Sequence, residues 1–284
     1  MLEILVYGAV TSAVYALLAM GFTLVFGVAR VLNLAHGSFY ALGAYGAYFY
    51  GAQLGLSPWA AGLLSIATVA AFGVAVERVF VRPLRRSPLA VLMITLGVSL
   101  LVEQLLFLTF GSEARNVPAL ARENVSVLGV QIGGQRLLTL CVGVLLLAVL
   151  WTFMRHTRLG AAILAISQDA EAAQYVGIDS NRIFVLVMAL SAALAAAGGV
   201  LVSPFLTVQP TMGLLPMIKA FSIVILGGLG SIPGSLLAAL VLGYSETLVA
   251  YLGSASYTEM VSLVAILVTL VLRPSGLFGA RAAV

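Results

Sequence analysis

The run ILVYGAVTSAVYALLAMGFTLVFGV, residues 4–28, decides the fold class because it has 25 consecutive residues and no charged side chain. About 20 apolar residues are enough to cross the hydrocarbon core of a bilayer as a helix. The residues before it, Met1-Leu2-Glu3, contain no basic segment, and no small-residue cleavage site follows the run. We therefore predict a retained transmembrane helix rather than a cleaved signal peptide.

The composition extends this prediction to the whole chain. Of its 284 residues, 62% are hydrophobic and 8% are charged, whereas about 25% of the residues of a soluble domain are charged. So few charges cannot cover a soluble globule of 29.5 kDa, which excludes a cytosolic enzyme, a nucleic-acid-binding domain and a disordered chain. No nucleic-acid partner is expected, because basic cytoplasmic loops explain the net charge of +4.

Further apolar runs, separated by polar residues, predict additional spans. The predicted spans lie near residues 4–28, 38–54, 58–77, 89–110, 137–154, 183–203, 214–230, 234–252 and 257–272. We predict an all-α integral membrane protein, a polytopic bundle of eight or nine transmembrane helices in a single domain, residues 1–284. The second and seventh spans are short, so we expect one of them to be re-entrant, tilted or broken.

The arginines predict the orientation of the bundle. Four of them lie in the segment 78–86 and two in the segment 155–158. Both segments should be cytoplasmic, because basic residues are retained on that side, and the two spans between them allow this. The N-terminus is then outside, the C-terminus is cytoplasmic, and the loop 111–136 is outside with Gly133-Gly134 as a turn.

A long connection, residues 155–182, is predicted on the cytoplasmic side. Its Ala-rich first half favours a helix, and Gly177 suits the left-handed position that follows a helix C-terminus. Asp179 or Ser180 can cap the next helix. We predict a short helix, a glycine turn and a new helix, which together form a docking element for another protein.

Several segments resemble one family of membrane proteins. Residues 171–177, Glu-Ala-Ala-Gln-Tyr-Val-Gly, fit the E-A-A-x-x-x-G pattern of the coupling loop of ABC importer permeases. Residues 33–38, Asn-Leu-Ala-His-Gly-Ser, resemble the N-L-A-x-G segment of the LivH-type branched-chain amino acid permeases. Residues 227–234, GGLGSIPG, and the C-terminal segment 273–279 are similar to the same family. The resemblance covers residues 5–279, and the chain lacks the proline-containing tail that some sugar and maltose permeases have after the motif.

This resemblance implies one subunit of a larger transporter in the bacterial cytoplasmic (inner) membrane. Such permeases pair with a second, related permease or a second copy. They bind two cytoplasmic ATPase subunits and receive a small amino acid from an extracytoplasmic substrate-binding protein. The resemblance assigns the coupling to Glu171, Ala172, Ala173 and Gly177. No catalytic residue, metal site or cofactor is expected in this chain. Its single lysine, Lys219, is not part of a G-x-x-x-x-G-K-[ST] segment, so ATP would be bound by partner subunits.

Two breaks in apolar runs and one carboxylate are candidates for the translocation pathway. The candidates are Asn33, His36, Ser38, Gly230, Ser231 and Glu246. A half-helix that begins at the first break would expose N–H groups that attract a carboxylate. The second break lies in the other half of the chain, as an internal repeat would place it. The carboxylate is costly inside a span unless it has a partner or a proton.

Each candidate also has a structural interpretation. His36 can be a satisfied histidine at a helix end, and the two Gly-Ser helix starts can match by accident. Glu103 and Glu259 can lie at the membrane interface. Lys219 is expected near the outer surface with its amine extended toward water.

Two other functions remain as alternatives. A secondary transporter or channel for a small polar solute would work without ATPase partners. It would need ion-coupling carboxylates, for which Glu103 and Glu246 are the candidates, and it would leave the docking segment without a purpose. An intramembrane hydrolase is disfavoured, because the only histidines are His36 and His156 and no paired aspartate motif exists.

Overall fold

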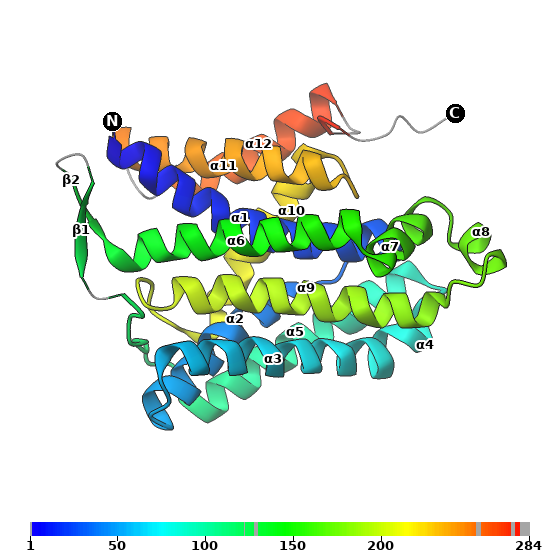
Figure 1. Ribbon diagram of the computed structural model, residues 1–284, viewed down its shortest axis with the longest axis horizontal. Coiled ribbons are helices and arrows are strands. Elements are labelled where there is room, and N and C mark those ends of the chain that lie inside the picture. Colours follow the sequence, from blue (N-terminus) through cyan, green and yellow to red (C-terminus); the bar gives the residue numbers. More distant parts are fainter. Residues whose placement is uncertain (1, 122, 128–129, 254–256, 274–275, 279–284) are drawn as a thin grey trace.

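The apolar runs form helices that lie side by side along the long axis of the molecule (Figure 1). The computed structural model describes residues 2–121, 123–127, 130–253, 257–273 and 276–278. The first part of the chain forms α1 (Leu2–Ala29), α2 (His36–Tyr48), a π-helical segment (Phe49–Gln53), α3 (Pro58–Val76), a second π-helical segment (Glu77–Val81), α4 (Arg82–Leu84), α5 (Pro88–Phe110), β1 (Asn124–Val127) and β2 (Val130–Gly133). The second part forms α6 (Gly134–His156), α7 (Arg158–Gln168), α8 (Ala170–Tyr175), α9 (Ser180–Val202), a 3-10 helix (Pro210–Gly213), α10 (Leu214–Gly227), α11 (Ile232–Leu252) and α12 (Thr258–Leu272).

Among the described residues, seven helices are long and apolar enough to cross a membrane. They are Glu3–Ala29, Pro58–Leu84, Pro88–Phe110, Gly134–His156, Ser180–Val202, Pro210–Gly227 and Ile232–Leu252. The apolar helix α12 is shorter, with 15 residues, and α2 has 13. The chain is therefore a polytopic helical membrane protein, as its composition predicts. The number of crossings and the placement of the termini stay predictions, and residues 279–284 lie outside the described residues.

The loop between α5 and α6 departs from the all-α prediction. It contains a two-stranded antiparallel hairpin, in which Asn124 pairs with Gly133 and Val125 with Ile132. The predicted turn at Gly133-Gly134 is wrong, because Gly133 ends β2 and Gly134 begins α6. Alternating β-branched residues favour such strands. The pairing of the two strands gives hydrogen-bond partners to backbone N–H and C=O groups that lie outside any helix.

The short second span is a helix that begins inside the bundle. After α1 ends, the chain turns at Asn33, whose side-chain oxygen accepts a hydrogen bond from the Ala35 N–H at 3.1 Å. The next helix begins at His36, which is fully buried and contacts Leu18 in the middle of α1. The break that the sequence predicts around residues 33–38 is therefore present in the fold.

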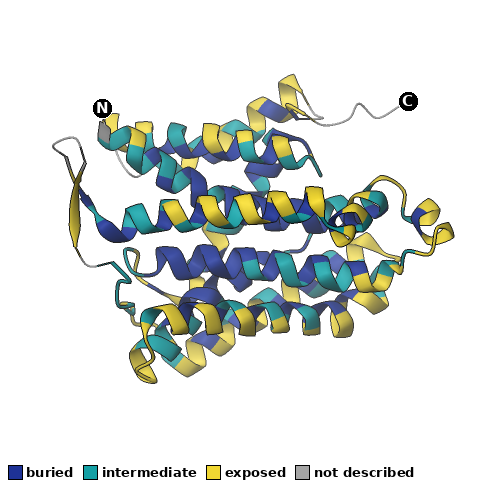
Figure 2. Cartoon of the chain, in the orientation of Figure 1, coloured by how far each residue is buried: buried dark blue, intermediate teal, exposed yellow. Residues whose placement is uncertain are grey.

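Small residues bring α9 close to three other helices. Residues 191–199 of α9 are almost all buried, and most of them are alanine or glycine. Gly21 of α1, Gly43 of α2 and Gly73 of α3 each lie so close to this segment that a Cβ atom would overlap it. Gly199 lies against the backbone carbonyl of Tyr40 in the same way. Such surfaces let helix backbones approach closely in membranes, and they make α9 the centre of the bundle (Figure 2).

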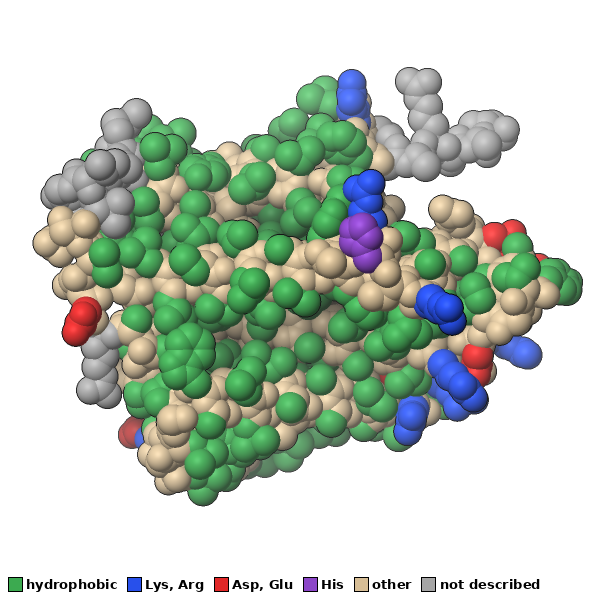
Figure 3. Space-filling view, in the orientation of Figure 1, with side chains coloured by type: hydrophobic (Ala, Val, Ile, Leu, Met, Phe, Trp, Pro, Cys, Tyr) green, Lys and Arg blue, Asp and Glu red, His purple; other side chains and the backbone are tan. Residues whose placement is uncertain are grey.

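Large apolar side chains cover the outside of the bundle. Leu63, Leu108 and Leu145 are each at least 60% exposed, and Figure 3 shows hydrophobic side chains over most of the visible face. The same view shows arginines concentrated at the end that contains α4, α7 and α8. This distribution suits a lateral surface in contact with lipid.

Candidate functional site

The segment between α6 and α9 projects from one end of the bundle (Figure 1). Helix α7 packs against the bundle through the buried side chains of Ile163 and Ile166. Asp169 then takes an extended conformation, and its carboxylate accepts the N–H groups of Glu171 and Ala172 at 2.9 and 3.0 Å. The prediction of one helix here is wrong, because this side chain caps a new helix, α8, and so separates it from α7.

The predicted glycine turn after α8 is confirmed. Gly177 has a φ of +86°. Its N–H donates to the Gln174 carbonyl at 2.9 Å, and the Ile178 N–H donates to the Ala173 carbonyl at 3.1 Å. This pair of bonds is a Schellman motif, which satisfies carbonyls at the helix end. Asp179 caps α9 by accepting the Asn181 N–H at 3.0 Å.

The exposure of α8 is uneven. Ala173 is buried, whereas Glu171 and Ala172 are exposed. Tyr175 and Val176 are 83% and 78% exposed, so two neighbouring large apolar side chains lie uncovered at the end of the molecule where the arginines are concentrated (Figure 3). The structure thus brings the four predicted coupling residues into one short helix and its terminating turn, with an exposed face beside them.

A polar cluster ties the beginning of α9 to the end of α3. Arg85 forms an ion pair with Glu77, whose side chain is 2% exposed. The same guanidinium donates to Asn181 Oδ1 at 2.9 Å and lies 4.0 Å from the ring centroid of Phe184. Arg85 would therefore transmit a displacement at the start of α9 to Glu77, directly after the end of α3.

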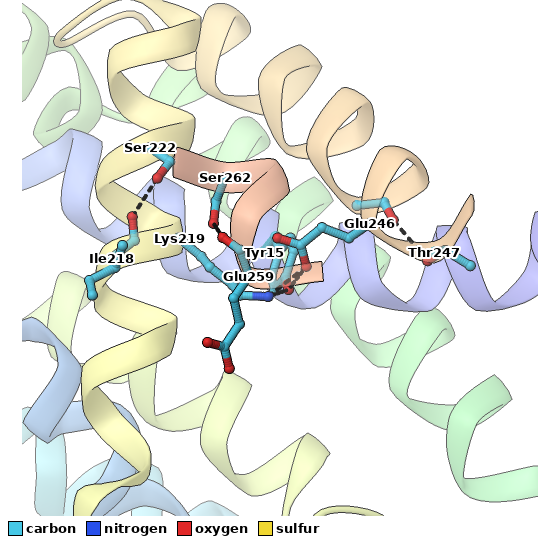
Figure 4. A network of polar contacts seen from close by, with 9 residues as sticks. Tyr15, Ile218, Lys219, Ser222, Glu246, Thr247, Glu259 and Ser262 are labelled. Atoms are coloured by element: carbon cyan, nitrogen blue, oxygen red, sulfur yellow. Dashed lines mark hydrogen bonds and ion pairs between the residues drawn. The ribbon is translucent and has the colours of Figure 1, made fainter. Parts of the chain in front are cut away.

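A second cluster lies inside the bundle and joins three helices. Figure 4 shows Tyr15 from α1, Lys219 from α10 and Glu246 from α11 pointing toward one another. The Lys219 amine donates to Glu246 Oε2 and to the Tyr15 hydroxyl, both at 2.6 Å, and the Tyr15 hydroxyl donates to the same carboxylate oxygen. The side chains of Lys219 and Glu246 are 14% and 5% exposed. Glu259, at the start of α12, points away from this cluster.

The ion pair corrects the expectation for Lys219 and gives Glu246 a partner. The amine does not extend to the outer surface. Glu246 Oε1 is buried, and no donor among the described residues lies within hydrogen-bond distance of it. A buried acceptor left without a partner costs about 1–3 kcal/mol, so this oxygen marks a place where a donor would bind favourably.

A cavity of about 690 Å³ borders this cluster. Its walls include Ile4 and Tyr7 near the start of α1 and Leu18 in the middle of that helix. Arg136 of α6, whose guanidinium lies 4.5 Å from the ring centroid of Tyr7, is a third charged residue of the lining. Ligand sites usually are mostly apolar cavities of about 300–1,000 Å³ with a few polar groups, and this cavity has that form.

The residues of the first break are held by protein partners and lie away from this cavity. His36 Nε2 lies 2.9 Å from the Leu18 carbonyl, and Nδ1 lies 3.2 Å from the Ser191 hydroxyl. Ser38 donates to Ser99 at 2.9 Å, and Asn33 is buried as well. None of the three break residues lines the 690 Å³ cavity. Their contacts hold the broken helix in place, and a role in the pathway stays a prediction.

The second break lies at a different depth. Gly230 has a φ of +83° and lies against Gly27 of α1, while the Ser231 hydroxyl accepts the Gly234 N–H at 3.2 Å and caps α11. Gly27 is nine residues beyond Leu18, the contact of His36, which corresponds to about 13 Å along a helix with a rise of 1.5 Å per residue. The structure does not bring the two breaks together. In the described part of the chain, no group of three or more His, Cys, Asp or Glu side chains could hold a metal ion.

Comparisons with known proteins place the chain in one family. The family described as "Branched-chain amino acid transport system / permease component" matches residues 4–271. The high-affinity branched-chain amino acid transport system permease protein BraD of Pseudomonas aeruginosa is 35% identical, over 98% of this chain and 95% of its own length. The corresponding protein LivH of Escherichia coli is 32% identical, over 96% of this chain and 93% of its own length.

A solved structure supports the fold. PsaBC from Streptococcus pneumoniae, in complex with Fab, matches with a TM-score of 0.54 and 16% identity, over 96% of this chain and 92% of that chain. At this identity the likeness concerns the arrangement of the helices alone. The family match covers nearly the whole chain and agrees with the motifs around Glu171 and Asn33. The chain therefore belongs to the family of branched-chain amino acid transport system permease components.

Proposed function

We propose that the chain is the transmembrane permease subunit of an ABC importer, and that residues 1–284 are its single permease domain. It lies in the bacterial cytoplasmic (inner) membrane as a multi-pass protein, with the N-terminus outside and the C-terminus in the cytoplasm. A second permease, LivM-like or a second copy, completes the pore. Two cytoplasmic ATPase subunits drive it, and an extracytoplasmic substrate-binding protein delivers a branched-chain or related small amino acid. The chain is not an enzyme and holds no cofactor, because ATP is bound by the ATPase subunits.

The exposed helix α8 is the observation that carries this proposal. Its E-A-A-x-x-x-G residues form a capped helix and a left-handed turn outside the bundle. A helix of six residues with little burial of its own is stabilised by a partner that covers its exposed side. The arginines at the same end of the molecule support a cytoplasmic location for this helix (Figure 3).

The fold offers a path from this helix to the rest of the bundle. α9 begins three residues after Gly177, and it packs against α1, α2 and α3 along its second half. Closure of the ATPase subunits on ATP would move α8 and tilt α9. The bundle would change from inward-open to outward-open, and hydrolysis would reverse the movement.

The experiment uses the complete complex with both ATPase subunits, reconstituted in liposomes with the binding protein. We expect uptake of a branched-chain amino acid that requires ATP, and ATP hydrolysis that the loaded binding protein stimulates. Glu171→Lys should weaken copurification of the ATPase subunits about tenfold or more, which corresponds to 1.4 kcal/mol, while leaving expression of the permease unchanged. Glu123→Lys makes the same charge change on an exposed residue at the opposite end and should leave copurification unchanged.

Two results would contradict the proposal. Uptake by the chain without ATPase subunits, down a gradient of the amino acid, would favour a secondary transporter or channel. Normal copurification and normal uptake with Glu171→Lys would remove α8 from the coupling.

A further inference from the structure

We propose that the cavity beside Tyr15, Lys219 and Glu246 is an intramembrane binding site for a zwitterionic amino acid. In this site the two charged residues exchange their mutual ion pair for the carboxylate and the ammonium group of the ligand. The inference rests on the proposed function and deepens it, because it names the residues that receive the substrate and the chemical groups that they recognise.

A buried charged pair is a costly way to join three helices. Ion pairs inside proteins are often replaced by apolar residues of similar volume without loss of stability, and ionisable residues inside a membrane bundle usually mark a functional site. Lys219 is the single lysine of the chain, and it lies 2.6 Å from a carboxylate on the next helix. The location of this pair in the wall of a cavity is what points to a ligand.

The arrangement of hydrogen bonds suits an exchange of partners. Glu246 uses Oε2 for both Lys219 and Tyr15, and Oε1 has no donor among the described residues. A ligand ammonium group carries three N–H donors and would satisfy this oxygen. The Tyr15 hydroxyl bonds to both charged groups, so it can hold one of them when the other turns to the ligand.

Charge balance selects the class of ligand. The cluster contains one positive and one negative side chain, and a zwitterion adds one charge of each sign. After the exchange the ligand carboxylate neutralises Lys219 and the ligand ammonium neutralises Glu246, so no charge is left without a partner in a medium of low dielectric constant. Within the cluster of Tyr15, Lys219 and Glu246, a simple cation would leave Lys219 without a counter-charge and a simple anion would leave Glu246 without one, which is strongly unfavourable there.

The cavity provides a route and a place for an aliphatic side chain. It extends from Ile4 to Leu18 along α1, about 21 Å at 1.5 Å per residue, and so connects the end with the hairpin to the charged cluster. Arg136 lies in its wall together with Lys219 and Glu246. These three give the lining a formal charge of +1, which attracts the carboxylate end of a zwitterion first. Apolar and aromatic residues make up most of the remaining lining.

The first test measures binding in the complete complex with the three residues of the cluster intact. Ala250 is exposed and lines the cavity. Its replacement by cysteine, in a Cys141→Ala background, gives a thiol whose labelling by a water-soluble methanethiosulfonate reports occupancy. We expect leucine to slow labelling. Isoamylamine, which lacks the carboxylate, and 4-methylpentanoate, which lacks the ammonium group, should each need at least about tenfold higher concentrations. Equal protection by all three compounds, or no protection by leucine, would overturn the inference without any change to the cluster.

The second test separates recognition from structure. Lys219→Met with Glu246→Gln removes both charges at nearly constant volume, so a purely structural pair would be replaced with little loss. We expect this double variant to keep its ATPase subunits and to lose leucine protection about tenfold or more. Glu103→Gln, a carboxylate in α5 that does not line the cavity, should leave protection unchanged. Unchanged protection in the double variant would refute the site.

These outcomes are distinct from a failure of the proposed function. Full ATP-driven uptake by the double variant would support the importer function and refute the binding site. Protection by leucine without ATP-driven uptake would support an amino acid site and refute the importer function.

Discussion

The left-handed turn at Gly177 allows a quantitative prediction about coupling. An ideal Cβ on this residue would meet no heavy atom within 4 Å, so a substitution there is penalised by the backbone conformation and not by contacts. The φ of +86° costs an ordinary L-residue about 1–2 kcal/mol. Since 1.4 kcal/mol is a factor of ten in an equilibrium constant, Gly177→Val should lower the ratio of formed to open turn by roughly 5–30-fold.

The turn can be observed directly through one amide. The Ile178 N–H donates to the Ala173 carbonyl only when the turn is formed, so its hydrogen-exchange protection should fall by about the same factor of 5–30 in Gly177→Val. Asparagine tolerates the left-handed region better than a β-branched residue does. Gly177→Asn is therefore the matched control and should retain most of the protection.

The same variants test the link to ATP hydrolysis. Stimulation of the ATPase by the loaded binding protein should decrease in the order wild type, Gly177→Asn, Gly177→Val. If Gly177→Val loses protection at Ile178 yet keeps full stimulation, the turn does not transmit the ATPase movement. If Ile178 keeps its protection in Gly177→Val, the conclusion that position 177 has a left-handed conformation unfavourable for valine is wrong.

Three further predictions concern stability and topology. Arg85→Met leaves the Glu77 carboxylate buried without its partner and should destabilise the protein by about 3–5 kcal/mol, measured by thermal inactivation in detergent. Adding Glu77→Gln should restore most of this loss, and no recovery would mean that the pair is not the cause. Gly199→Ala should lower thermal stability, because the added Cβ would overlap the backbone carbonyl of Tyr40. Gly97→Ala, where a Cβ would meet no atom within 4 Å, should not. Equal effects of the two substitutions would contradict the close approach of α9 to α2. A cysteine at Asn124 should react with a membrane-impermeant reagent only from outside the cell, and labelling only from the cytoplasm would reverse the orientation.

The apolar helices could be predicted from the sequence because each depends on a local run of apolar residues, whereas the number of membrane crossings stays a prediction. The start and end of α5, for example, fall within one residue of the predicted range. The Gly177 turn could be predicted for the same reason, since a glycine after a helical segment needs no distant partner. The split between α7 and α8 was missed because Asp169 has two local options, a helical position or a cap, and the pattern of neighbouring residues does not decide between them.

The intramembrane cluster could not be predicted, because its members are far apart in the sequence. Tyr15 is 204 residues from Lys219 and 231 from Glu246, so their meeting depends on how α1, α10 and α11 pack. The sequence did mark Glu246 as costly inside a span without a partner. Two facts could have indicated Lys219 as the partner of Glu246. Lys219 is the single lysine of the chain, and it lies in α10, the helix directly before α11 in the sequence.

The packing of α9 has a mechanical consequence. Its second half packs closely against α1, α2 and α3 through the small residues 191–199. Its first half is attached to the end of α3 through longer side chains, because the Arg85 guanidinium contacts Asn181 and the ring of Phe184. The distance from Ser180 to about residue 190 is some 15 Å at a rise of 1.5 Å per residue, so a tilt of about 10° about the closely packed segment would move the start of α9 by roughly 3 Å. Such a movement has to carry the Arg85 cluster with it, and a larger tilt has to turn α1, α2 and α3 as well. The residue at which the close packing begins therefore limits how far a movement of α8 can displace the start of α9.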